Sequence, residues 1–260
     1  MQTVSVILMI ILMTASTASN VFAKTLFSTF IKERPKLIMR LTKSGLEESI
    51  VKNTLYDFRI GFYPELLKSI AGEGYDYFDP VKGIFTEQSL QRGRKVVIEN
   101  EEVLSKIERR FEIPKEILVG IYRVETNLGR NVGRYVVVNS LLTWTVSGTR
   151  RTKWAESELF SYLTICKYYK YDPFDIWGSS HGAFGLMQFI PSSFLLYAVK
   201  YENSFGEEID PFDFADAMSS AANYLRRHKH KNDGIKKAIY AYNHNWQYVK
   251  AVMQYSDRLK

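Results

Sequence analysis

EILVGIYRVETNLGRNVGR, from Glu116 to Arg134, is the stretch that decides the predicted fold. Pro114 stands just before it, where the fixed φ of proline suits the first position of a helix. Gly129 can close that helix, because glycine adopts the left-handed backbone conformation that ends many helices. Apolar residues recur between these two positions at helical spacing. The stretch therefore predicts a helix with one buried face.

This helix carries an acidic residue on its apolar side. At about 100° per residue, Glu125 lies about 80° from Ile117, between Ile121 and Leu118. A carboxyl group that faces a core is desolvated, which raises its pKa and lets it donate a proton near neutral pH. Glu125 is thus a candidate general acid. The alternative is a glutamate at the edge of the buried stripe that reaches solvent or pairs with an arginine.

The remaining sequence is helical almost throughout, which predicts a mainly α fold. Tyr135–Val138 gives the best strand signal, and Trp177–Ile190 is glycine-rich and irregular. Further helical patterns occupy about residues Thr86–Arg110, Trp154–Tyr169, Ser192–Tyr201, Phe212–His228 and Gly234–Tyr255.

The composition is that of a globular protein. Of 260 residues, 46% are hydrophobic and 24% are charged, which excludes disorder, collagen and a coiled-coil rod for the whole chain. The single cysteine, Cys166, excludes a disulfide framework within the chain and is expected to be a buried thiol. No zinc-ligand spacing is present. The net charge of +7 suits nucleic acid, a membrane surface or an acidic polymer, and does not choose among them.

The first residues predict export. An apolar run, Val6–Met13, is followed by Val21-Phe22-Ala23, an acceptable cleavage site before Lys24. Residues 1–23 are therefore predicted to be a signal peptide, with an uncleaved anchor as the alternative. No cysteine lies near residue 23, which excludes a bacterial lipoprotein anchor. After it we expect an N-terminal helical region, residues 24–105, packed on a catalytic domain, residues 106–260. The protein would be periplasmic or associated with the cell wall.

The sequence resembles the B-type lytic murein transglycosylases, which share a lysozyme-like helical fold. The likeness covers about residues 87–260 and rests on separated blocks in the same order. These blocks are VET with Glu125, Gly129 and Gly133; Asn139-Ser140-Leu141-Leu142; Arg150-Arg151; GSSHGAFGLMQFIPSSF, Gly178–Phe194; and AYNHNWQYVKAV, Ala241–Val252.

The resemblance implies cleavage of the β-1,4 bond between N-acetylmuramic acid and N-acetylglucosamine in peptidoglycan. Glu125 would protonate the leaving oxygen and then take the proton of the C6 hydroxyl of the same muramoyl residue, giving a 1,6-anhydro product. Other glycosidases need a second carboxylate, and the sequence offers no obvious one. A muramidase of the same fold, a catalytically silent wall-binding module and, more distantly, a nucleic-acid-binding protein are the alternatives.

The resemblance also implies a set of substrate-binding residues. Their alternatives are structural: a buried aromatic for Tyr242, a helix cap for Asn243 and a solvated surface pair for Arg150 and Arg151. The expected substrate-binding residues are Ser179, Gln188, Tyr242, Asn243, Arg150 and Arg151.

We expect neither a cofactor nor a bound metal. Several B-type enzymes carry a calcium loop whose counterpart here is Tyr201–Asp210, and the alternating Asp/Asn ligand spacing is absent from it. The expected partners are peptidoglycan glycan strands. We expect no nucleic acid, no membrane span after signal cleavage, and a monomer.

Overall fold

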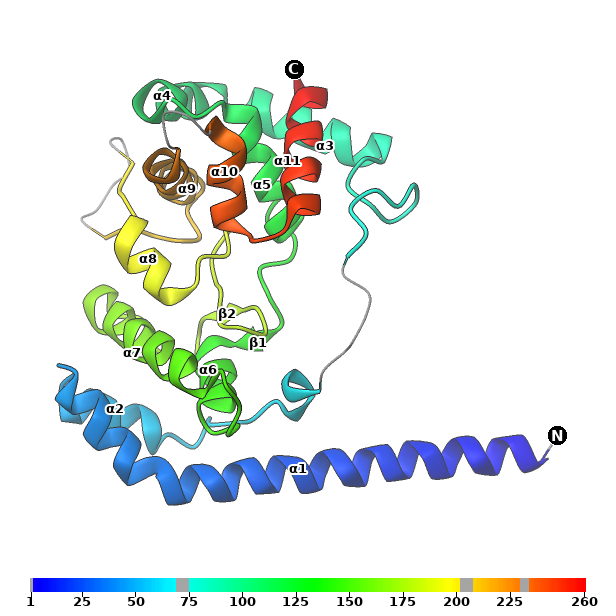
Figure 1. Ribbon diagram of the computed structural model, residues 1–260, viewed down its shortest axis with the longest axis vertical. Helices are drawn as coiled ribbons and strands as arrows, with labels where there is room; N and C mark the ends of the chain where they lie inside the picture. Colours follow the sequence, from blue (N-terminus) through cyan, green and yellow to red (C-terminus); the bar gives the residue numbers. More distant parts are fainter. Residues whose placement is uncertain (1, 69–74, 202–207, 230–233) are drawn as a thin grey trace. The chain divides into compact units, whose positions relative to one another are not determined.

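The helix expected after Pro114 is present in the computed structural model as α5, Lys115–Thr126. The structure describes residues 2–68, 75–201, 208–229 and 234–260, with side chains from residue 21 onward. The chain divides into two compact units. Unit 1 comprises residues 1–70, 135–176 and 180–182, and unit 2 comprises residues 71–134, 177–179 and 183–260. Both units are mainly helical, as predicted (Figure 1).

Helix α5 forms the centre of unit 2. It contacts α3, α4, α9 and α11, and Ile117, Leu118 and Ile121 are buried as the sequence pattern predicts. Gly120 lets α11 approach closely, since a Cβ there would lie 3.2 Å from the Val252 carbonyl oxygen. The other elements of unit 2 are α3 (Glu87–Glu99), α4 (Glu101–Phe111), β2 (Trp177–Gly178), α8 (Pro191–Tyr197), α9 (Phe214–His228), α10 (Gly234–Tyr242) and α11 (Trp246–Leu259).

Two of the long helical patterns are each two helices. The pattern at Thr86–Arg110 is interrupted at Asn100, which caps α3 and precedes α4. The pattern at Gly234–Tyr255 is interrupted after Tyr242, and Asn245 caps α11 by accepting the Gln247 N–H at 2.8 Å. In both places an asparagine lies at the break between two helices, while the apolar residues keep their helical spacing across it. Periodicity alone therefore did not show the break.

The exact end of α5 and the extent of the strand also differ from the prediction. Helix α5 ends at Thr126, because Asn127 and Leu128 adopt left-handed φ values of 53° and 58° before Gly129 is reached. Strand β1 comprises only Tyr135 and Val136. The β-branched residues that follow it begin α6 instead, because they are buried in the core of unit 1.

Unit 1 consists mostly of helices, of which α6 is buried on all sides. Helix α6 packs on α7, and α1 packs on α2 and the short 3-10 helix. Within the described part of the chain, no helix combines the length and apolar character that crossing a membrane requires. The elements are α1 (Gln2–Lys43), α2 (Glu48–Leu55), the 3-10 helix η1 (Pro64–Leu67), β1, α6 (Val137–Thr145) and α7 (Thr152–Tyr169).

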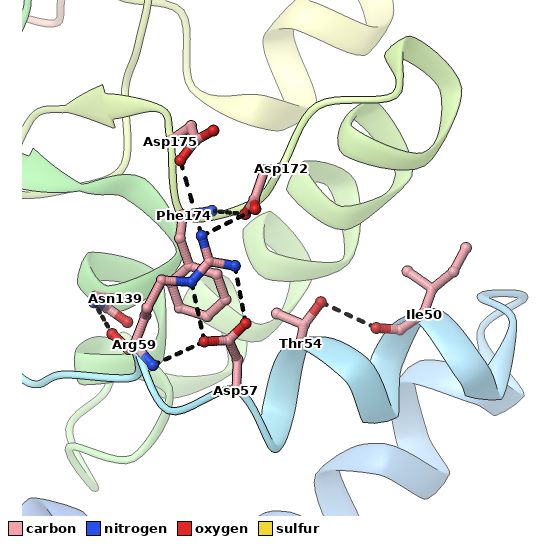
Figure 2. A network of polar contacts seen from close by, with 8 residues as sticks. All are labelled: Ile50, Thr54, Asp57, Arg59, Asn139, Asp172, Phe174 and Asp175. Carbon is pink, nitrogen blue, oxygen red and sulfur yellow. Dashed lines mark hydrogen bonds and ion pairs between the residues drawn. The ribbon is translucent and has the colours of Figure 1, made fainter.

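Arg59 ties the segment after α2 to the loop after α7 (Figure 2). Its guanidinium donates to Asp57 at 2.9 and 3.1 Å and pairs with Asp172 at 2.9 Å. The same group lies over the Phe174 ring, 4.5 Å from its centroid. Asn139 adds a hydrogen bond from its side chain to the Arg59 carbonyl oxygen, at 3.1 Å. Through its contacts with Asp57, Asp172 and Phe174, the Arg59 side chain holds two loops of unit 1 together.

Replacing Arg59 with Gln should lower the thermal midpoint by a few degrees at pH 7. The Arg59 guanidinium lowers the pKa of the Asp57 carboxyl. A carboxyl group whose pKa is lower in the folded than in the unfolded protein stabilises the fold at pH values above its unfolded pKa. This stabilisation is lost as the pH falls through the pKa of the folded state. The difference between the variant and the unmodified protein should therefore shrink at pH 2. Arg150→Gln, an exposed change in the same unit, is the control; an Arg59 effect that is equal at both pH values contradicts the ion-pair role.

Candidate active site

Glu125 lies in the last turn of α5 with its carboxyl group turned toward α11. The Tyr248 hydroxyl of α11 donates a hydrogen bond to Glu125 Oε1 at 2.6 Å. Tyr248 is fully buried, and Glu125 is partly buried. Among the described residues, Glu125 forms no ion pair. Arg123, the nearest arginine in sequence, instead donates to the Ser89 hydroxyl at 2.7 Å.

The surroundings of Glu125 favour its protonated form at neutral pH. Burial raises the pKa of the carboxyl from 4.5 to about 7, although the hydrogen bond from Tyr248 lowers it in part. Burial, and then the charge of Glu125, raise the pKa values of the Tyr77, Tyr242 and Tyr248 phenols. All of these phenols are therefore protonated near neutral pH and can act as donors. The site holds one carboxyl group poised to gain or lose a proton near pH 7.

Tyr248→Phe should move the pH dependence of catalysis upward. The Tyr248 hydrogen bond stabilises the carboxylate, so removing it raises the pKa of Glu125 further. If protonated Glu125 acts as a general acid, kcat/KM falls as the pH rises through about 7 in the unmodified protein. In the variant that fall occurs at higher pH, with the plateau changed by less than about tenfold because the acid remains. A fall in kcat/KM that occurs at the same pH or at a lower pH in the variant contradicts this role of Tyr248.

Tyr242 ends α10 close enough to Glu125 for the carboxylate charge to affect its phenol. Its hydroxyl donates to the Met187 carbonyl oxygen at 2.5 Å, which holds the loop before α8. Tyr242 and Gln188 also line one pocket of about 260 Å³, together with Phe189. Asn243 follows α10 directly, and its N–H donates to the Ile239 carbonyl oxygen at 3.1 Å. Two of the predicted residues, Tyr242 and Gln188, are thus brought together.

Gln188 holds the loop between β2 and α8. Its Nε2 donates to the carbonyl oxygens of Val132 and Gly185, at 3.0 and 2.9 Å. Its backbone has a φ of 47°, a left-handed conformation that costs a residue with a Cβ about 1–2 kcal/mol. Gly185 has no such cost, and a Cβ there would lie 2.7 Å from the Pro211 carbonyl oxygen. Strained backbone of this kind is concentrated at functional sites.

Ser179 closes the other end of this loop. Its hydroxyl accepts the Ala183 N–H at 3.0 Å, and its own N–H donates to the Ala183 carbonyl oxygen at 2.7 Å. The glycine next to it is packed on the segment after α5: a Cβ on Gly133 would lie 2.1 Å from the Gly178 carbonyl oxygen. Ser179 therefore supports the loop that carries Gln188, and both belong to unit 2 with Glu125 and Tyr242.

Arg150 and Arg151 belong to unit 1, not to the unit that contains Glu125. Both are exposed. The Arg151 guanidinium lies over the rings of Trp144 and Trp154, 5.5 and 6.0 Å from their centroids. Trp144 in turn stacks on His181, with ring centroids 5.2 Å apart. Arg151 is thus held over an aromatic surface within unit 1.

The sequence prediction missed two residues that organise the site. Tyr248 supplies the hydrogen bond to the Glu125 carboxyl group. Thr126 is fully buried and donates to the Leu186 carbonyl oxygen at 2.9 Å, joining the end of α5 to the Gln188 loop. A signal for Tyr248 was available, because Tyr248, Val252 and Tyr255 form one buried stripe of α11 at helical spacing.

No metal centre can be assigned from the described residues. They contain no group of three or more His, Cys, Asp or Glu side chains that could hold an ion. The part of the calcium-loop counterpart at residues 202–207 lies outside the described residues. The expectation for that loop stays a prediction.

Residues 40–237 match the transglycosylase SLT domain family. Over 147 residues the chain is 33% identical to membrane-bound lytic murein transglycosylase B of Escherichia coli, a match that covers 56% of this chain and 40% of that protein. The Escherichia coli lytic transglycosylase Slt35, in complex with bulgecin A, superposes with a TM-score of 0.77 at 22% identity, covering 87% of this chain and 92% of that one. SltB3 from Pseudomonas aeruginosa, in complex with NAG-anhNAM-pentapeptide, has a TM-score of 0.76 at 18% identity, with 88% and 78% covered.

These matches confirm the predicted fold, which is that of the lytic transglycosylases. The chain belongs to the transglycosylase SLT domain family, since the match covers most of its length. It spans about two fifths of the length of the Escherichia coli relative.

Proposed function

We propose that this protein is a peptidoglycan lytic transglycosylase that uses Glu125 first as an acid and then as a base. The observation that carries the proposal is the environment of the Glu125 carboxyl group. This group accepts a hydrogen bond from the buried Tyr248 phenol, and burial raises the pKa of the carboxyl group to about 7. Such a group can be protonated before the reaction and ionised during it at the same pH. Membership of the family and the likeness to the Escherichia coli enzyme support the same activity.

The chemistry needs only this one group. Protonated Glu125 gives its proton to the glycosidic oxygen as the bond from C1 of N-acetylmuramic acid breaks. The carboxylate that remains takes the proton of the C6 hydroxyl, and the C6 oxygen bonds to C1. The proton balance closes, because Glu125 ends protonated and no water is consumed. Tyr248 orients the carboxyl group and stabilises it while it is charged.

The environment of Glu125 within the described residues favours this route over hydrolysis. Among the described residues, no other acid contributes to the pKa shift of Glu125. A muramidase would need a second carboxylate to activate water or to act as nucleophile, at a separation of about 5–10 Å. A nucleophile within the substrate removes that requirement. The muramidase and the silent wall-binding module remain as outcomes of the test.

The glycan strand is proposed to lie along the loop that carries Gln188. Tyr242 and Gln188 line the pocket in unit 2, and Ser179 and Asn243 complete the predicted set on that unit. The SltB3 structures with NAG-anhNAM-pentapeptide and NAG-NAM-pentapeptide support a substrate of this class. For Arg150 and Arg151 we propose a contact with stem-peptide carboxylates by charge-assisted hydrogen bonds.

We further propose that the protein is exported to the periplasm or cell wall, where such a substrate lies. The apolar run Val6–Met13 and the cleavage site at Ala23 support this location. The proposed organisation is a signal peptide over residues 1–23, a helical region over 24–105 and the catalytic domain over 106–260. A monomer suffices, because the one acid–base group belongs to a single chain.

The test is mass spectrometry of muropeptides released from purified peptidoglycan. Products lighter by one water than their reducing-end counterparts, made by the unmodified protein and not by Glu125→Gln, would support the proposal. Reducing-end products would make the protein a muramidase. Absence of products, with the protein sedimenting alongside the wall, would favour the binding module.

A further inference from the structure

Helix α1 presents an apolar row to solvent. Phe27, Ile31 and Met39 are 50%, 40% and 63% exposed. The neighbouring side of the helix packs in the core of unit 1, where Leu26 and Phe30 are buried. Phe27 also packs edge-on against the Phe62 ring, with centroids 6.3 Å apart, and about half of its surface stays exposed. The members of the row follow one another at intervals of four residues: Phe27, Ile31, Pro35 and Met39.

Lysines run beside this row. At about 100° per residue, Lys32, Lys36 and Lys43 fall within an arc of about 40° next to Met39. All three lysines are exposed, and Lys36 also pairs with Glu33 of the same helix at 3.3 Å. The segment from Lys24 to Lys43 has six Lys+Arg and one Glu. The solvent side of α1 is thus apolar along one line and strongly basic along the next.

A groove between α1 and α2 continues the apolar row. It has a volume of about 540 Å³, and its lining includes Ile38, Met39 and Tyr56. Lys43, Glu48 and Lys52 also line it, and the Lys52 ammonium pairs with the Glu48 carboxylate at 2.7 Å. An apolar hollow beside the Lys43 ammonium group matches a molecule with a hydrocarbon part next to an anionic head.

We propose that this face of α1 binds an anionic lipid surface, with the apolar row in the outer part of the bilayer and the lysines at the headgroups. Helices that lie in membrane interfaces combine these two features. A second copy of the chain is a poor occupant, because two such basic faces repel each other. A glycan offers no hydrocarbon partner for Ile31, Pro35 and Met39 of this row. The proposal concerns attachment and is independent of the proposed reaction.

The first test measures partitioning of the full chain onto vesicles. The partition coefficient on vesicles of phosphatidylglycerol and phosphatidylcholine is divided by that on vesicles of phosphatidylcholine alone. This ratio cancels the contribution of the apolar run Val6–Met13, which binds both kinds of vesicle. Lys32→Gln/Lys36→Gln/Lys43→Gln should lower that ratio about a hundredfold, since each lysine near such a surface contributes about fivefold. The matched control, Lys82→Gln/Lys95→Gln/Lys153→Gln, makes the same charge change on exposed lysines elsewhere. Equal losses in the two triple variants would overturn the proposal.

The second test reports on the face itself. Ile31→Cys carries an environment-sensitive fluorophore, and the native Cys166 is buried at 3% exposure and stays unlabelled. The emission of the fluorophore at residue 31 should shift to the blue when anionic vesicles are added. The same label attached to Ser157→Cys on α7 should not respond. Circular dichroism checks that both variants fold. No shift at residue 31, or an equal shift at both positions, would overturn the proposal.

Discussion

Glu125→Gln lowers the rate of glycan cleavage by at least about a thousandfold, the effect expected when a general acid is lost. The amide has almost the same shape as the protonated carboxyl group and can still accept the Tyr248 hydrogen bond. It can neither give a proton to the leaving oxygen nor take one from the C6 hydroxyl. The loss should therefore appear in kcat, with KM little changed.

The measurement is the initial rate of release of soluble muropeptides, combined with sedimentation of the variant on intact peptidoglycan. Glu116→Gln, in the first turn of the same helix, makes the same chemical change away from the site and should keep full activity. Near-normal turnover by Glu125→Gln would remove Glu125 from the mechanism. A parallel loss of binding would indicate a structural role instead.

The same substitution should stabilise the protein at alkaline pH. Since the pKa of Glu125 is raised from 4.5 to about 7, its ionisation costs the folded state about 3 kcal/mol, at about 1.4 kcal/mol per unit. A raised folded-state pKa gives stability that is fully present below the unfolded pKa and is lost as the pH rises through the folded value. The neutral amide introduced by Glu125→Gln avoids this loss. The variant should therefore gain up to about 3 kcal/mol in the free energy of unfolding at pH 8.

Urea denaturation at pH 4.5 and pH 8 checks this expectation. At pH 4.5 the folded carboxyl group is protonated, so the variant and the unmodified protein should differ little. Glu116→Gln, whose carboxyl group is near the start of α5, should show no gain at pH 8. A Glu125→Gln variant that is less stable than the unmodified protein at pH 8 contradicts a buried, proton-holding Glu125. Such a result would favour a solvated carboxylate.

The position of Glu125 on the apolar face of α5 could be predicted from spacing, because one helix fixes the relation between its own side chains. The fold also followed from the order of separated motifs. Cys166 is buried as predicted, and burial raises the pKa of its thiol to about 12. These features depend on local sequence or on its resemblance to a family.

The surroundings of the carboxyl group could not be predicted in the same way. Tyr248 reaches Glu125 from a helix more than a hundred residues later, a contact set by packing between α5 and α11. Substrate binding by Gln188 stays a prediction, and the hydrogen bonds from its amide nitrogen to two backbone carbonyl groups could not be predicted from the sequence. Periodicity shows which face of each helix is buried, but it does not show which helices pack against each other. Backbone conformations such as the left-handed φ of Gln188 are likewise set by tertiary contacts.

The most direct test of the central claim is digestion of peptidoglycan in water enriched in oxygen-18. If Glu125 directs the C6 hydroxyl onto C1, the products carry no label and are lighter by one water than their reducing-end counterparts. Omission of the enzyme and the Glu125→Gln variant control for spontaneous cleavage and exchange. Incorporation of one labelled oxygen at the new reducing end would contradict the account, since it would show that water, and not the substrate hydroxyl, attacks C1.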